Sequence, residues 1–127
     1  MVVYQKHSKR KVSGSRLISA EKKRLANMGS KPSSTKVENR KLRTKRSLGG
    51  HIKNFLLSEN KINVIDPKTK KAKITEISTV LESPANRHFV RRNIITRGSI
   101  VETKLGKVRI TSRPGQEGSI NGILLEK

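Results

Sequence analysis

The excess of positive charge constrains this chain more than any other feature of its sequence. There are 30 Lys and Arg residues against 9 Asp and Glu residues, which gives a formal net charge of +21 over 127 residues. A compact domain with such an excess repels itself unless a polyanion neutralises it. The strongest candidate is the phosphate backbone of a nucleic acid, where Lys and Arg side chains displace condensed counterions. The charge therefore predicts a nucleic-acid partner.

The positive charge is concentrated in the first part of the chain. The first 53 residues contain 16 Lys and Arg residues but only two acidic residues, Glu21 and Glu38, so they carry two thirds of the excess. Large apolar side chains are scarce here, and such a segment cannot bury enough surface to offset the entropy lost on ordering. We therefore expect an extended basic RNA-binding arm over residues 1–35, largely disordered in the free protein, and a body over residues 36–127.

One local element stands out in the arm. Ser19 is a candidate N-cap for a short helix from Ala20 to about Met28, which Gly29 would end. Leu25 and Met28 would share one face of this helix, with basic residues around the rest. The same residues also fit a solvated turn in the free protein. A basic helix that forms only against RNA is the functional alternative.

From about Ile52 onward, short β-branched runs alternate with turn residues, which is typical of β-strands. Val108 and Ile110 alternate with polar residues and follow the run 100–103, which predicts a hairpin with Ile100, Val108 and Ile110 in the interior. Further expected elements are a hairpin of residues 55–57 and 62–65, a turn at 66–69, a helical turn within 86–92 and a last strand over 120–125. Residues 72–81 also fit an apolar helical face, but their β-branched content favours a strand with possible bulges. Many short strands favour a small barrel or sandwich. We expect an all-β protein with a small β-barrel-like body behind the arm.

Enzymatic and metal-binding sites find little support in the sequence. Cysteine is absent, and His7, His51 and His88 are scattered without the His-x-x-x-His spacing of a helical metal site. We expect no catalytic residue, no cofactor and no metal. No apolar stretch is long enough to span a membrane, and the N-terminus lacks the apolar run of a signal peptide. A soluble, intracellular protein with no membrane partner is therefore expected.

The candidate binding residues are instead basic, and they form clusters that are densest in residues 40–46. Arg43 and Lys45 alternate with Leu42, Thr44 and Arg46. In an extended strand alternate side chains face opposite sides, so one of these sets would face phosphate while the other would face the barrel. Only three side chains are aromatic, too few for a base-stacking platform, so we expect contacts to phosphate, sugar and RNA shape. The predicted RNA-binding residues are Lys9, Arg10, Lys11, Arg16, Lys22, Lys23, Arg24, Arg40, Lys41, Arg43, Lys45, Arg46, Arg87, Arg91, Arg92 and Arg113.

A long block in the second half of the chain is distinctive. Residues 83–98 (SPANRHFVRRNIITRG) closely resemble a signature block of the archaeal and eukaryotic small-subunit ribosomal proteins of the S8e family. Residues 111–118 (TSRPGQEG) are similar to the closing motif of the archaeal form, and the opening residues 4–14 also match. The sequence departs from the family at residues 47–51, where family members often carry Arg-Gly-Gly-Asn. The large insertion typical of eukaryotic members is absent, so the chain resembles the archaeal form.

The resemblance implies a β-barrel-like body with a basic N-terminal arm, located in the small ribosomal subunit. Its partners would be small-subunit ribosomal RNA and neighbouring ribosomal proteins, with the protein present as a monomer. Its role would be structural, with Lys and Arg contacts to phosphate that bind and stabilise the folded RNA. A ribosome-assembly factor is the nearest alternative. A general DNA-binding protein and a metal-dependent nuclease are alternatives from other classes.

Overall fold

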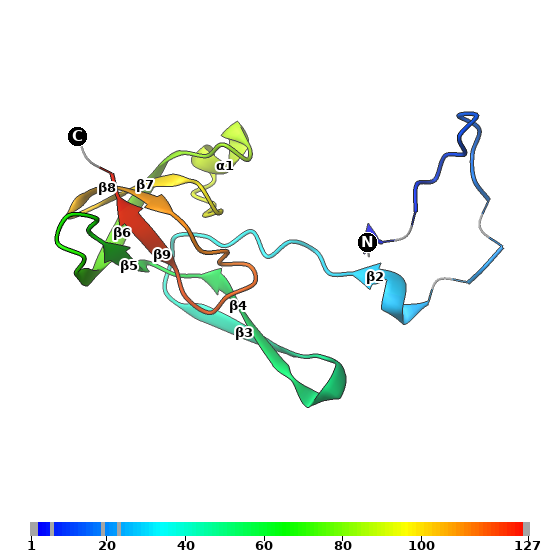
Figure 1. Ribbon diagram of the computed structural model, residues 1–127, viewed down its shortest axis with the longest axis horizontal. Coiled ribbons are helices and arrows are strands. Elements are labelled where there is room, and N and C mark those ends of the chain that lie inside the picture. Colours follow the sequence, from blue (N-terminus) through cyan, green and yellow to red (C-terminus); the bar gives the residue numbers. More distant parts are fainter. Residues whose placement is uncertain (1–2, 6, 19, 23, 126–127) are drawn as a thin grey trace. The chain divides into compact units, whose positions relative to one another are not determined.

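The computed structural model describes residues 3–5, 7–18, 20–22 and 24–125. Contacts divide the chain into two units, residues 1–32 and residues 33–127. This division falls three residues before the expected end of the arm at residue 35. The predicted all-β class is confirmed, since strands dominate and the larger unit contains a closed barrel (Figure 1).

Five strands of the larger unit close into the barrel. They are β5 (Lys61–Ile65), β6 (Ala72–Glu82), β7 (Ile100–Thr103), β8 (Gly106–Ile110) and β9 (Asn121–Leu124). Successive strands pair antiparallel, and β9 pairs parallel with β5 to complete the ring. The expected β7–β8 hairpin and the last strand are confirmed. Closure pairs both edges of the sheet, which protects it from edge-to-edge association.

The barrel interior is filled by aliphatic side chains from several elements. Along β8, Val108 and Ile110 are buried while Lys107 and Arg109 are exposed, as the two-residue period predicts. The buried cluster also includes Leu56, Ile62, Val64, Ile77, Val80, Ile95, Val101 and Ile120. These side chains give the small body a single core.

The assignment of Ile100 to the barrel interior is wrong. Val101 is fully buried and lies opposite Val108, whereas Ile100 lies opposite the exposed Arg109 and is only partly buried. Residues that face each other in an antiparallel pair lie on the same side of the sheet. The register therefore places Val101, not Ile100, in the core.

The longest strand, β6, is bulged as expected. Its pairing with β7 shifts between Ile77 and Thr79 and again between Val80 and Glu82. A bulge bends a strand and increases its twist. Two such irregularities in an 11-residue strand help it to curve around a barrel of only five strands.

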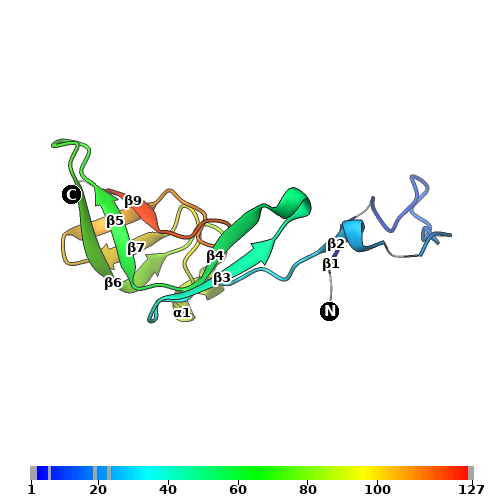
Figure 2. The ribbon, with the colours of Figure 1, turned by 90° about the horizontal axis from the view of Figure 1, so that it is seen from below.

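A second, two-stranded sheet is formed by β3 (Lys41–Arg46) and β4 (Ile52–Ser58), and it projects from the barrel (Figure 2). The expected hairpin between residues 55–57 and 62–65 is wrong, because β4 pairs with β3 while β5 pairs with β6 and β9. The chain changes sheet at Glu59, whose buried carboxylate accepts a hydrogen bond from the backbone N–H of Lys61 at 3.2 Å. Only the last part of β4 enters the core, through Leu56 and Ser58.

The signature block forms a short helix and a buried extended segment. Helix α1 (Arg87–Arg91) begins after Asn86, whose side-chain oxygen accepts a hydrogen bond from the backbone N–H of His88 at 2.9 Å, so the expected helical turn is confirmed. Beyond α1, the backbone N–H of Ile95 donates to the carbonyl of Thr35 at 2.8 Å, and the Thr35 hydroxyl donates to the carbonyl of Leu56. No helix among the described residues has the length and apolarity needed to cross a membrane.

The smaller unit contains little regular structure. β1 (Val3–Tyr4) pairs with β2 (Met28–Gly29), and the 3-10 turn η1 (Leu25–Asn27) precedes β2. The expected helix from Ala20 to Met28 is therefore wrong in extent, and its proposed cap, Ser19, lies outside the described residues. Short helices without a packed apolar face are marginal, and Leu25 is exposed.

Candidate nucleic-acid interface

The predicted RNA-binding residues that the structure describes lie at the surface. Of the 16, Lys23 falls outside the described residues, and all the others are exposed. Exposure is necessary for contact with phosphate but does not distinguish a binding surface from a solvated one. The elements that carry these side chains therefore decide which of them can act together.

The β3–β4 hairpin brings several basic residues onto one face. In its register Arg43 lies opposite Phe55 and Lys45 lies opposite Lys53. All six residues of β3 are exposed, so the expectation that its other face packs on the barrel is wrong. The reason is that β3 pairs only with β4, outside the ring of barrel strands.

This face of the hairpin carries only positive charges. Two residues of like charge, Lys45 and Lys53, lie directly opposite each other in the strand pair. No acidic residue is present in either strand. The guanidinium of Arg43 lies over the Phe55 ring, 6.0 Å from its centroid, a geometry typical of a cation–π contact. A polyanion along this face would lie against Arg43, Lys45 and Lys53 together.

Lys53 was missing from the predicted set. Its neighbours in sequence are uncharged, so it belongs to no basic cluster. Only the register of the hairpin places it beside Lys45. The signal that could have identified it is the pair Gly49 and Gly50, which marks the turn that folds β4 back on β3.

The hairpin ends in an exposed turn, η2 (Leu48–Gly50). Gly49 and Gly50 have φ angles of 74° and 80°, a conformation that side chains with a Cβ rarely adopt. The backbone N–H of Ser47 donates to the carbonyl of His51 at 2.6 Å and closes the turn. Leu48, at the tip, is 95% exposed.

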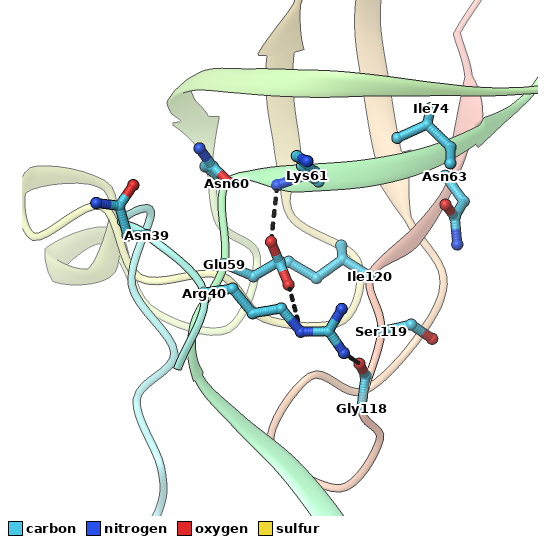
Figure 3. Close-up of a pocket in the computed structure, with 10 residues that line it drawn as sticks. All are labelled: Asn39, Arg40, Glu59, Asn60, Lys61, Asn63, Ile74, Gly118, Ser119 and Ile120. Carbon is cyan, nitrogen blue, oxygen red and sulfur yellow. Dashed lines mark hydrogen bonds and ion pairs between the residues drawn. The ribbon is translucent and has the colours of Figure 1, made fainter. Parts of the chain in front are cut away.

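Arg40, which precedes β3, has two polar partners in the body. Its Nε atom lies 3.3 Å from the carboxylate of Glu59, and its Nη2 atom donates to the carbonyl of Gly118 at 3.4 Å (Figure 3). The Glu59 side chain is nearly buried, whereas 60% of the Arg40 side chain is exposed. Arg40 thus connects the start of the hairpin to the barrel and still presents its guanidinium to solvent.

A second group of basic residues surrounds the short helix. Arg87 and Arg91 lie on α1 and Arg92 is its C-cap, and all three are exposed. Arg113 lies in the loop between β8 and β9 and is also exposed. In the smaller unit, Arg10 and Arg16 form an isolated bridge, and the Arg10 guanidinium donates to the carbonyl of Gly14 at 2.9 Å.

Two carboxylates of the body have local partners. Hydrogen bonds from the backbone N–H of Lys68 and the hydroxyl of Thr69 lower the pKa of Asp66. The Lys104 ammonium lies 2.9 Å from Glu76 and lowers the pKa of that carboxyl. Among the described residues, no three His, Asp or Glu side chains gather in a way that could hold a metal ion.

Comparison with known proteins decides the family. The model of the family described as Ribosomal protein S8e matches residues 4–125. The chain belongs to this family. Membership confirms the resemblance carried by residues 83–98 and identifies a ribosomal protein of the small subunit rather than an enzyme.

Individual relatives match the S8e chain along its whole length. Small ribosomal subunit protein eS8 of Methanosphaera stadtmanae is 47% identical over 126 residues, which cover 99% of this chain and 100% of the relative. The protein of the same name from Sulfolobus acidocaldarius is 43% identical over 128 residues, with both chains fully covered. That of Methanosarcina barkeri is 41% identical over 123 residues, 97% of this chain and 98% of the relative. These relatives agree with the expected archaeal form.

Proposed function

We propose that this S8e protein binds folded ribosomal RNA of the small subunit mainly through contacts of Lys and Arg with phosphate. The observation that supports this most directly is the face of the β3–β4 hairpin that carries Arg43, Lys45 and Lys53 without an acidic residue in either strand. Closely spaced phosphates would be attracted to this concentration of positive charge and would release their condensed counterions on binding.

The projecting hairpin suits the surface of a folded RNA. Both faces of β3 are exposed, so the hairpin can enter a space bordered by phosphates on more than one side. The arginines on and beside α1 offer a second positive surface on the body, and the basic residues of the smaller unit add a third. Several separate surfaces are what a protein needs to fix RNA segments relative to one another.

The test is the salt dependence of binding to a fragment of small-subunit ribosomal RNA. Each lost phosphate contact reduces the magnitude of the slope of log affinity against log salt by about 1. We expect this change in Arg43→Ala and in Arg91→Ala, with weaker binding across RNA sequences. Lys104→Ala is the matched control, because Lys104 is exposed but paired with Glu76. Unchanged slopes in both arginine variants would show that Arg43 and Arg91 do not contact phosphate.

Retention on the ribosome separates a structural constituent from an assembly factor. A structural constituent, present as one copy beside its ribosomal-protein neighbours in the cytoplasm, should co-sediment with mature small subunits after a high-salt wash. An assembly factor should be found only on precursors. Comparable affinity for duplex DNA and for the RNA fragment would instead favour a general DNA-binding protein.

A further inference from the structure

A pocket beside Arg40 is lined by both polar and apolar side chains, whereas phosphate binding calls only for basic and polar ones. It has a volume of about 430 Å³, within the range of roughly 300–1,000 Å³ that is common for small-ligand sites. Its walls come from the two residues before β3, the corner between β4 and β5, strands β5 and β6, and the loop before β9 (Figure 3). The pocket therefore lies where the hairpin joins the barrel.

One wall is the guanidinium of Arg40, which has two partners within the body. Glu59 and the carbonyl of Gly118 hold two of its nitrogens, at 3.3 and 3.4 Å. The Glu59 carboxylate is itself occupied, by Arg40 and by the backbone N–H of Lys61. A planar guanidinium held in this way can stack on a flat ring without losing further side-chain entropy.

The other side of the pocket combines apolar surface with an amide. Figure 3 shows Ile74 and Asn63 across the pocket from Arg40, with Ile120 between them. Ile74 is 72% exposed, a large apolar surface for a chain of such high charge. Asn63 donates through Nδ2 to Oδ1 of Asn121 at 2.9 Å, and no described residue donates a hydrogen bond to its side-chain oxygen, Oδ1.

This set of groups fits a nucleobase. RNA-binding proteins commonly hold an unpaired base by stacking it on an aromatic ring or an Arg plane and by bonding its edge. The chain has only three aromatic side chains, so an arginine is the available stacking group. Asn63 offers an acceptor and a donor to a base edge, and Lys61 lies at the pocket for the phosphate of the same nucleotide.

We propose that this pocket binds one unpaired nucleobase of the ribosomal RNA, stacked on Arg40 and flanked by Ile74 and Asn63. The proposal rests on the proposed function, since the base would belong to the same RNA whose phosphates contact the hairpin. It adds one base-specific anchor to a surface that otherwise recognises backbone.

The experiment compares RNA with and without bases. The full-length protein is titrated with the pentanucleotides of adenosine, cytidine and uridine and with an abasic ribose-phosphate chain of equal length. At least one base-bearing chain should bind roughly 2- to 5-fold more tightly than the abasic chain, the range expected for one exposed stacking contact. The side-chain amide NMR signals of Asn63 should shift with that chain and not with the abasic one.

Two variants locate the effect in the pocket. Arg40→Lys keeps the charge beside Glu59 but removes the plane, and Ile74→Ala removes exposed apolar surface at little cost to folding. Both should abolish the preference for the base-bearing chain. Arg109→Lys and Ile65→Ala are the matched controls, because both residues are exposed on barrel strands and neither lines the pocket.

Two results would overturn the proposal. One is equal binding of all four chains with no shift of the Asn63 signals. The other is a base preference that survives in both Arg40→Lys and Ile74→Ala. In either case strong, salt-dependent binding of the abasic chain would leave the phosphate-binding function standing, so the two failures are distinguishable.

Discussion

At the residue scale, substitution of Ile110 should have the clearest effect on the free energy of unfolding. Its side chain is 1% exposed in the centre of the barrel core. Ile110→Ala should lower the free energy of unfolding by about 2–5 kcal/mol, because the deletion removes buried surface and leaves a cavity. Ile52→Ala, where the side chain is 70% exposed, should change it by no more than about 0.5 kcal/mol. Denaturant melts of the full chain measure both, and an equal effect of the two variants would contradict the burial.

A second residue-scale prediction concerns the turn at Asp66. The bonds from the Lys68 N–H and the Thr69 hydroxyl hold its pKa below the ordinary value. The ionised carboxylate therefore stabilises the folded turn above the unfolded pKa, and this stabilisation is lost as the pH falls through the lower folded pKa. In Thr69→Val the pKa of Asp66 should rise, but not fully, since the Lys68 bond remains. NMR titration of the carboxyl signal tests this, and an unchanged pKa would exclude the Thr69 bond.

Single residues also show where sequence reasoning stops. The alternation in residues 107–111 identified Val108 and Ile110 as core residues, because polar neighbours fix which set faces inward. Ile100 and Val101 are both apolar, so a two-residue period gives no choice between them. The choice is made by the pairing of Val101 with Val108, which depends on the length of the turn.

At the element scale, the β3–β4 hairpin depends on its turn. Gly50 has a φ of 80°, and an alanine there is strained by about 1–2 kcal/mol. Gly50→Ala should therefore speed amide hydrogen exchange in the outer half of the hairpin while leaving the barrel strands unchanged. Gly50→Asn should have a smaller effect, because Asn tolerates this conformation better. Exchange that accelerates equally in β8 would show that the hairpin and the barrel open together.

The hairpin is also the element that the sequence predicted least well. The basic strand β3 has no apolar alternation, so nothing in its pattern shows that it pairs with β4. The partner of β4 is β3, which precedes it in the chain. The prediction instead paired β4 with residues 62–65, the apolar run that follows it. The corner at Glu59, whose carboxylate is buried, directs β4 and β5 into different sheets. By contrast, the β-branched content of residues 72–81 correctly predicted β6.

At the scale of the whole molecule, charge and strand content predicted the general character of the protein correctly. The barrel and the membership of a ribosomal protein family both agree with an all-β body and a polyanionic partner. The arrangement of the binding residues was harder to predict, because residues such as Lys45 and Lys53 meet only through strand pairing. Composition gives the sign and size of the net charge, whereas strand pairing determines which charged residues lie next to each other.

The last prediction concerns the division of the chain into an arm and a body. Residues 1–35 are dense in Lys and Arg and poor in core-forming side chains, whereas the body has a closed barrel and a buried core. Limited trypsin digestion of the free protein should therefore remove the arm first and leave a resistant fragment from about Thr35 to Lys127. Thr35 is buried and bonded to Leu56, so cleavage should stop near it.

Binding to RNA should change this digestion pattern in one direction. Phosphates that neutralise the arm should slow its cleavage, while the rate of cleavage within the barrel stays the same. The comparison is made at one salt concentration with and without the small-subunit RNA fragment, and mass spectrometry identifies the first sites cut. Rapid cleavage throughout the second half of the chain, with an intact arm in the free protein, would overturn the division. If RNA does not slow cleavage of the arm, the division into arm and body still holds. The arm would then not belong to the RNA-binding surface.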